Sequence, residues 1–179
     1  MPRGIFRSAV VACAVAVFAV STATACGDGE PTGAPRKVVQ IKQMLLPGQI
    51  LGLDVAKESV EKVLAGARRP YIKAVGLYSF RKEELLQATL QVSQFTPDAD
   101  FESDGFRRTV AQQIVGTSSE LPAFRMGDRT VYLGGNVKQS IAVWFDGSLM
   151  MVLAERAEFE QPRALLRDLI GRDLGEDLA

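Results

Sequence analysis

Apolar and polar residues alternate most regularly between Leu86 and Ser93. Every second residue is apolar (Leu86, Ala88, Leu90 and Val92), and the residues between them are hydrophilic (Gln87, Thr89, Gln91 and Ser93). Successive side chains of a strand point to opposite faces of a sheet. The pattern therefore predicts a half-buried strand with one apolar face and one wet face.

Further strands are indicated by turn residues between apolar runs. Three turn signals divide the segment Ala123–Glu155: Gly127-Asp128, Gly134-Gly135-Asn136 and Asp146-Gly147. The runs between them are rich in Val, Ile, Tyr, Trp and Phe, so an antiparallel meander is expected there. Upstream, the sequence predicts short strands within Val38–Leu53, which contains a turn at Pro47-Gly48. It also predicts a strand over Tyr71–Phe80 and a polar turn over Arg81–Glu84.

Three helices are predicted from apolar residues that recur with helical spacing. The first would be capped by Asp54, end before Pro70 and share one apolar face: Val60, Val63, Leu64 and Ala67. The second runs over Asp104–Val115, with a stripe of Phe106, Val110 and Ile114. The third opens at Pro162 and buries Leu165, Leu166, Leu169 and Ile170. These elements predict one α+β domain over residues 37–179, with an antiparallel sheet of about six to eight strands and three helices.

The hairpin around Asp146-Gly147 is apolar on both faces. A two-residue turn there would pair Phe145 with Ser148, Val143 with Met150 and Ile141 with Val152. The opposite face would carry Trp144, Leu149 and Met151. Burial on both sides is the simplest interpretation. The alternative is that Trp144, Leu149 and Met151 line a groove for a lipid, a peptide or a protein partner.

The N-terminal segment has the order of a secretory signal. Arg3 and Arg7 give a positively charged start, residues 8–20 are almost wholly apolar, and small residues lead to Cys26. The segment resembles a bacterial lipoprotein signal, in which a small residue precedes the lipidated cysteine. Thr24, Ala25 and Cys26 match that pattern, whereas Ala23 stands where the family usually has Leu.

The resemblance implies a cleaved signal peptide over residues 1–25 and an acylated Cys26 on the extracytoplasmic face of the cell membrane. Residues 26–36 would then form a flexible tether rich in Gly, Pro, Asp and Glu. Two acyl chains, for example palmitate, hold a protein stably on a bilayer, whereas one is marginal. Plain secretion and an uncleaved anchor are the alternatives.

Composition excludes several classes of function. The whole chain has 21 basic and 21 acidic residues, and loss of Arg3 and Arg7 with the signal would leave a net charge of −2. This balance indicates no nucleic-acid partner. Cys13 would leave with the signal, so neither a disulfide nor a cysteine metal site is expected. The chain has no histidine, which excludes Ser-His-Asp and Cys-His catalysis and zincin motifs.

Two further motifs each match a known pattern in part. Asp100, Glu102 and Asp104 alternate before Gly105 as in a calcium loop, but Ala111 stands where the bidentate Glu is expected. An acidic segment beside a helix N-terminus explains them as well. Ser59 and Lys62 match the Ser-x-x-Lys pattern of penicillin-binding proteins, but no Lys-Thr-Gly follows anywhere.

The sequence therefore predicts a membrane-anchored module with a non-catalytic binding, sensing or accessory role and no cofactor. The alternatives are a carrier of an apolar ligand and a histidine-independent hydrolase of the cell envelope. A convergent pair of carboxylates or a Ser-Lys pair would indicate the hydrolase, and a dry apolar cavity would indicate the carrier.

Overall fold

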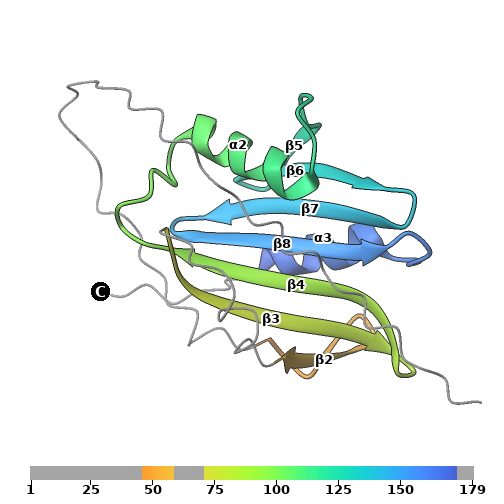
Figure 1. Cartoon of the computed structure of the whole chain (residues 1–179). Coiled ribbons are helices and arrows are strands. Elements are labelled where there is room, and N and C mark those ends of the chain that lie inside the picture. Colours follow the sequence, from red (N-terminus) through yellow and green to blue (C-terminus); the bar gives the residue numbers. More distant parts are fainter. Residues whose placement is uncertain (1–45, 59–70, 173–179) are drawn as a thin grey trace, which may run out of the picture.

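The computed structural model describes residues 46–58 and 71–172. Eight strands form one antiparallel sheet in the order β1-β2-β3-β4-β8-β7-β6-β5 (Figure 1). The strands are β1 (Gln49–Ile50), β2 (Leu53–Glu58), β3 (Ile72–Lys82), β4 (Leu85–Phe95), β5 (Ala123–Met126), β6 (Arg129–Asn136), β7 (Gln139–Asp146) and β8 (Leu149–Arg156). The helices of the described ranges are α2 (Asp104–Val115) and α3 (Pro162–Gly171). None of the described helices is long and apolar enough to cross a bilayer.

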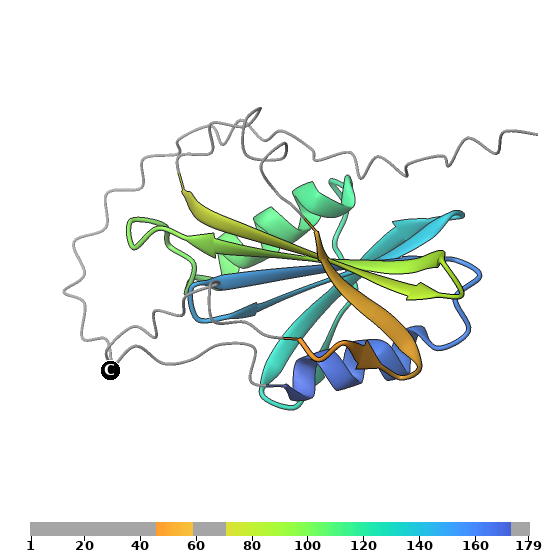
Figure 2. The same ribbon diagram turned by 90° about the horizontal axis from the view of Figure 1, so that it is seen from below.

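The two helices cover opposite faces of the sheet, which makes three layers (Figure 2). The expected antiparallel sheet of an α+β domain is confirmed. The expectation of three helices is not matched, because the described residues contain two. The proposed cap Asp54 was wrong, since Asp54 lies within β2 and pairs with Arg81 of β3. The apolar stripe expected on that helix falls in residues 59–70, outside the described ranges.

The larger core lies between α3 and the sheet. The apolar face predicted for β4 is confirmed, because Ala88, Leu90 and Val92 all enter this core. The predicted wet face is not wet along its whole length, because Ser93 is 0% exposed. From α3, the predicted stripe of Leu165, Leu166, Leu169 and Ile170 is buried against it. Pro162 stands in the first turn, where its missing N–H leaves no intrahelical bond unmade.

The second core lies under α2 and is rich in aromatic rings. Ser103 caps this helix, because its Oγ accepts a hydrogen bond from the backbone N–H of Phe106. Gly134 of β6 lies directly beneath the last turn, and a Cβ on it would clash with Val115. The glycine thus permits the close approach of helix and sheet. The expected turn at Gly134-Gly135-Asn136 was therefore wrong: these residues complete β6, and the turn follows them.

The β7–β8 hairpin has a register different from the one expected. Its turn residues are Gly147 and Ser148, so Asp146 pairs with Leu149 and Trp144 pairs with Met151. Gly147 has φ = 52°, which suits the first position of a tight hairpin turn. Each residue of β7 pairs with a residue two positions further along β8 than expected. Because side chains alternate between the two faces of a sheet, a shift of two residues leaves every side chain on the face expected for it. The grouping of Trp144, Leu149 and Met151 on one face therefore survives the change of register.

The β3–β4 hairpin turns through Glu83 and Glu84, within the polar turn expected from the sequence. Both residues have positive φ, 50° and 66°. Such backbone angles suit glycine and asparagine and are unfavourable for a residue with a longer side chain. This turn therefore stores local backbone strain.

Candidate functional site

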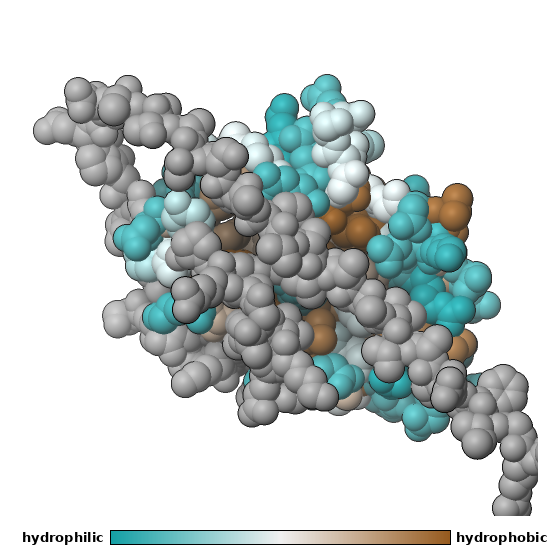
Figure 3. Space-filling view, in the orientation of Figure 1, coloured by the Kyte–Doolittle hydropathy of each residue, from teal (hydrophilic) through white to brown (hydrophobic). Residues whose placement is uncertain are grey.

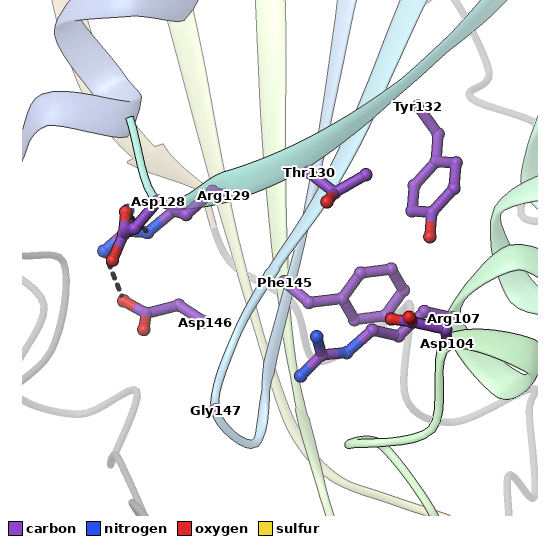
Figure 4. A pocket seen from close by; sticks show the side chains of 9 residues that line it. All are labelled: Asp104, Arg107, Asp128, Arg129, Thr130, Tyr132, Phe145, Asp146 and Gly147. Atoms are coloured by element: carbon purple, nitrogen blue, oxygen red, sulfur yellow. Dashed lines mark hydrogen bonds and ion pairs between the residues drawn. The ribbon is translucent and has the colours of Figure 1, made fainter. Parts of the chain in front are cut away.

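A small polar cleft opens at the end of the sheet where the β5–β6 and β7–β8 turns approach the N-terminus of α2 (Figure 4). Its volume is about 160 Å³. Nine residues line it: Asp104, Arg107, Asp128, Arg129, Thr130, Tyr132, Phe145, Asp146 and Gly147. The described surface in the upper part of Figure 3, which has the orientation of Figure 1, is mostly teal to white, that is, hydrophilic to neutral. Most of the residues that line the cleft carry hydrogen-bonding groups, and Phe145 and Tyr132 add aromatic rings.

Arg129 lines one side of the cleft and is held in place by two hydrogen bonds. Its Nη2 donates a hydrogen bond to Oδ2 of Asp146 at 2.8 Å, and its Nη1 donates to the backbone oxygen of Ile170 at 2.9 Å. The side chains of Arg129 and Asp146 are only 12% and 15% exposed. This ion pair therefore joins β6 and β7 and ties both to the last turn of α3. The carbonyls at a helix C-terminus lack intrahelical donors, so the bond to Ile170 also serves as a cap.

Arg107 forms the opposite side, from the first turns of α2. Its Nε donates to the backbone oxygen of Phe101 at 2.6 Å, and its guanidinium carbon lies 5.7 Å from the centre of the Phe145 ring. Phe145 in turn packs edge-on against Tyr132 and is stacked with Phe95. The guanidinium is thus held by one short hydrogen bond and one cation–π contact. A cation fixed in this way is positioned before any ligand arrives.

Tyr132 supplies the most informative polar group. Only 5% of this residue is exposed, yet its hydroxyl points into the cleft between Thr130 and the Arg107 side chain (Figure 4). Within the described part of the chain, that hydroxyl has no hydrogen-bond partner. Burial raises the pKa of Tyr132, and the carboxylate of Asp104 raises it further, whereas Arg108 and Arg107 lower it. The phenol therefore stays protonated at neutral pH and can both donate and accept.

The charges of the cleft nearly cancel. Arg129 and Asp146 neutralise each other at 2.8 Å, and Asp128 lies at the rim with 90% of its side chain exposed. Asp104 and Arg107 remain, three positions apart on α2 and on the side that lines the cleft. One acceptor and one donor of opposite charge therefore face the same small space.

Trp144, Leu149 and Met151, the groove proposed from the sequence, lie in the core beneath α3. All three are 0% exposed and pack within the larger core. The simplest interpretation of the sequence, burial on both faces of the hairpin, therefore agrees with the structure. A groove along this face was wrong, because α3 covers the side that the three side chains share.

The weak calcium candidate finds no support in the geometry. Across residues 46–58 and 71–172, no three acidic, cysteine or histidine side chains converge closely enough to hold a metal ion. Asp104 instead occupies the first turn of α2, where a carboxylate meets the positive end of the helix. Cys26, the lipidation candidate, and the Ser59/Lys62 motif lie outside the described ranges.

A second chemically unusual group lies at the far end of the sheet. Glu155 of β8 is 5% exposed, and burial raises its pKa to about 7, partly opposed by a hydrogen bond from Ser140. Ser140 Oγ donates to Oε2 at 3.1 Å, while Oε1 has no partner in the described residues. A carboxyl in this state is a candidate for proton-linked behaviour.

Of the residues that line the cleft, the sequence singled out only Asp104 as a candidate site residue, and as a calcium ligand rather than as part of this site. Arg107, Thr130 and Tyr132 come from a helix and a strand more than 20 residues apart, and none belongs to a recognisable motif. The only local signal was the spacing of Asp104 and Arg107 on one side of a predicted helix. No family model matches the chain, and no curated protein matches it.

Proposed function

We propose that this protein is a lipid-anchored module of the extracytoplasmic membrane face with a non-catalytic binding or sensing role. Residues 1–25 are its signal peptide, Cys26 carries the lipid, and residues 26–36 are the tether. The support for the anchor is the tripeptide Thr24-Ala25-Cys26 after a charged start and an apolar run. The cleft at the N-terminus of α2 is its ligand site.

One observation carries the binding role. Tyr132 is almost wholly buried, yet it turns an unsatisfied hydroxyl toward a cleft whose walls are fixed by Arg107 and Arg129. This hydroxyl opens onto the cleft and has no hydrogen-bond partner among the described residues, so it can donate to and accept from a ligand or water there. Rigid polar groups around a small concave space are the usual form of a binding site.

The two alternatives have weaker support. An apolar carrier needs an open apolar cavity, but its candidate face at Trp144 is packed within the core at 0% exposure. A hydrolase is favoured only by Glu155, whose pKa of about 7 suits a general acid or base. Its 5% exposure leaves a substrate little access to that carboxyl. The binding role is therefore the better supported.

Replacement of the lipidation site tests the anchor. Full-length protein with Cys26→Ala should move from the membrane fraction to the medium or the soluble envelope fraction. The matched control is Cys13→Ala, which removes the other cysteine from within the signal and should leave the protein on the membrane. A Cys26→Ala protein that stays on the membrane would contradict lipid anchoring and indicate an uncleaved N-terminal helix.

A further inference from the structure

We propose that the cleft binds the hydroxyl groups of a single uncharged sugar ring, either free or at the end of a glycan. This inference rests on the proposed binding role and names the class of ligand. It draws on the size of the cleft, the balance of its charges and the placement of its hydroxyl groups.

The size of the cleft limits the ligand to about one ring. Its volume of about 160 Å³ lies below the range of roughly 300–1,000 Å³ that is typical of sites for drug-sized ligands. A water molecule occupies about 30 Å³ in the liquid, so the space corresponds to roughly five waters. A single sugar ring, which displaces a comparable group of waters, fits this limit. A lipid chain does not.

The charges favour a neutral ligand. Asp146 forms an ion pair with Arg129, so the guanidinium of Arg129 is not available to an incoming anion. Asp104 would repel a free phosphate or carboxylate that approached Arg107. A pair of neighbouring hydroxyls suits this arrangement, because one can donate to the Asp104 carboxylate while the next accepts from the guanidinium of Arg107.

The cleft also contains two hydroxyl groups that can form hydrogen bonds with a sugar, those of Tyr132 and Thr130. Tyr132 and Thr130 lie two residues apart on β6, so both side chains leave the same face of the sheet. Each hydroxyl can donate one hydrogen bond and accept another, as a sugar hydroxyl does. Tyr132 is the independent sign of a ligand here, because the residue is only 5% exposed while its hydroxyl opens into the cleft without a hydrogen-bond partner in the described chain. The bond to Phe101 occupies Nε of Arg107 and leaves the terminal guanidinium nitrogens for a ligand.

Isothermal titration calorimetry with full-length protein in detergent micelles tests the inference. The probes are glucose and N-acetylglucosamine, their methyl glycosides, and two charged comparators, inorganic phosphate and glycine. We expect at least one sugar to bind and both comparators to fail. Equal binding of the free sugar and its methyl glycoside would assign the site to the end of a glycan. A preference for the free sugar would assign it to a monosaccharide.

Matched variants locate the binding. Loss of one ligand hydrogen bond should weaken Kd by about 3- to 10-fold in Tyr132→Phe and by about 10-fold or more in Asp104→Asn. The controls are Tyr71→Phe and Asp100→Asn, which lie outside the cleft and should change Kd by less than about 2-fold. Thermal melting of each variant confirms that it is folded.

The outcomes separate the two proposals. Binding of glycine or phosphate that is lost in the same variants would overturn the sugar class and leave the binding role intact. Sugar binding that Tyr132→Phe and Asp104→Asn do not weaken would overturn the cleft as the site. A third outcome is that none of the probes binds to the wild-type protein and that the four variants have the same melting temperature as wild type. This outcome would overturn both the ligand class and the ligand-binding role of the cleft.

Discussion

Arg129 and Asp146 form an ion pair of 2.8 Å that lies at the meeting point of two strands and a helix end. The same guanidinium holds the backbone oxygen of Ile170, so one side chain fixes both the wall of the cleft and the C-terminus of α3. Few side chains in the described sheet link elements so far apart in sequence. The stability of the cleft is therefore tied to the stability of α3 packing.

Removal of one partner of this pair should be costly. Asp146→Ala leaves the Arg129 guanidinium largely buried without its counter-ion, so we expect a loss of about 3 kcal/mol in the free energy of unfolding. Urea denaturation measures the change. The control is Asp168→Ala, which breaks the Arg172–Asp168 pair, whose side chains are 36% and 29% exposed. That pair should contribute less than about 1 kcal/mol, and equal losses in the two variants would contradict a special role for Arg129.

Trp144 should behave as a core residue. Because it is 0% exposed, truncation to alanine should lower the free energy of unfolding by about 3–5 kcal/mol. It is the only tryptophan of the chain, so its fluorescence reports one site. The emission should be blue-shifted and poorly quenched by acrylamide, and Val137→Ala at a 93% exposed turn should leave both stability and emission unchanged. Ready quenching in the native protein would refute the packing beneath α3.

Glu155 should make stability depend on pH. Its pKa is raised from 4.5 to about 7 by burial, so the folded state keeps a proton that the unfolded state loses. The stabilisation is fully present below about pH 4.5 and is lost as the pH rises through about 7. A shift of this size corresponds to about 3 kcal/mol across that window.

Glu155→Gln should remove this part of the pH dependence, because the amide does not ionise. Melting temperature measured from pH 4 to pH 9 tests the point. Ser140→Ala should raise the pKa of Glu155 further, because the hydrogen bond that lowers it is lost. The drop in stability should then move to higher pH. Glu160→Gln, on an exposed residue, is the control, and a profile for Glu155→Gln that matches wild type would rule out this role.

The β3–β4 turn should be open to stabilisation. Glu83 and Glu84 both have positive φ, and Asn-Gly adopts such a turn with much less strain. Glu83→Asn combined with Glu84→Gly should raise the free energy of unfolding by about 1–2 kcal/mol. The double alanine variant separates strain from charge, because it removes both carboxylates and keeps the unfavourable backbone. If the alanine variant gains as much stability, charge repulsion rather than backbone strain is the cause.

The regular elements could be predicted because their signals are local. The period of two in β4, the stripe of Leu165, Leu166, Leu169 and Ile170, and the bounds of α2 all follow from spacing along the chain. The error at Asp54 has a physical cause. A residue that suits a helix cap also suits an exposed position of an outer strand, and pairing with Arg81 decides between them.

The cleft could not be predicted because its walls meet only in the folded chain. Arg107 and Tyr132 are joined through the Phe145 ring, a contact among three separate elements. Gly134 is a similar case. Its sequence context suggested a turn, whereas in the fold its missing side chain leaves room for Val115 of α2. This tertiary contact leaves no pattern in the local sequence.

The order of the strands divides the sheet into two consecutive halves. Strands β1–β4 precede α2 and strands β5–β8 follow it. Within the described sheet, the two halves are paired through residues 88–94 of β4 and residues 149–155 of β8. Each half on its own would expose an apolar central strand with a free hydrogen-bonding edge, which invites association. A break in the 96–103 connection would therefore yield two fragments, one with β4 as a free edge strand and one with β8 as a free edge strand. Pairing of β4 with β8 would join the two fragments and rebuild the sheet.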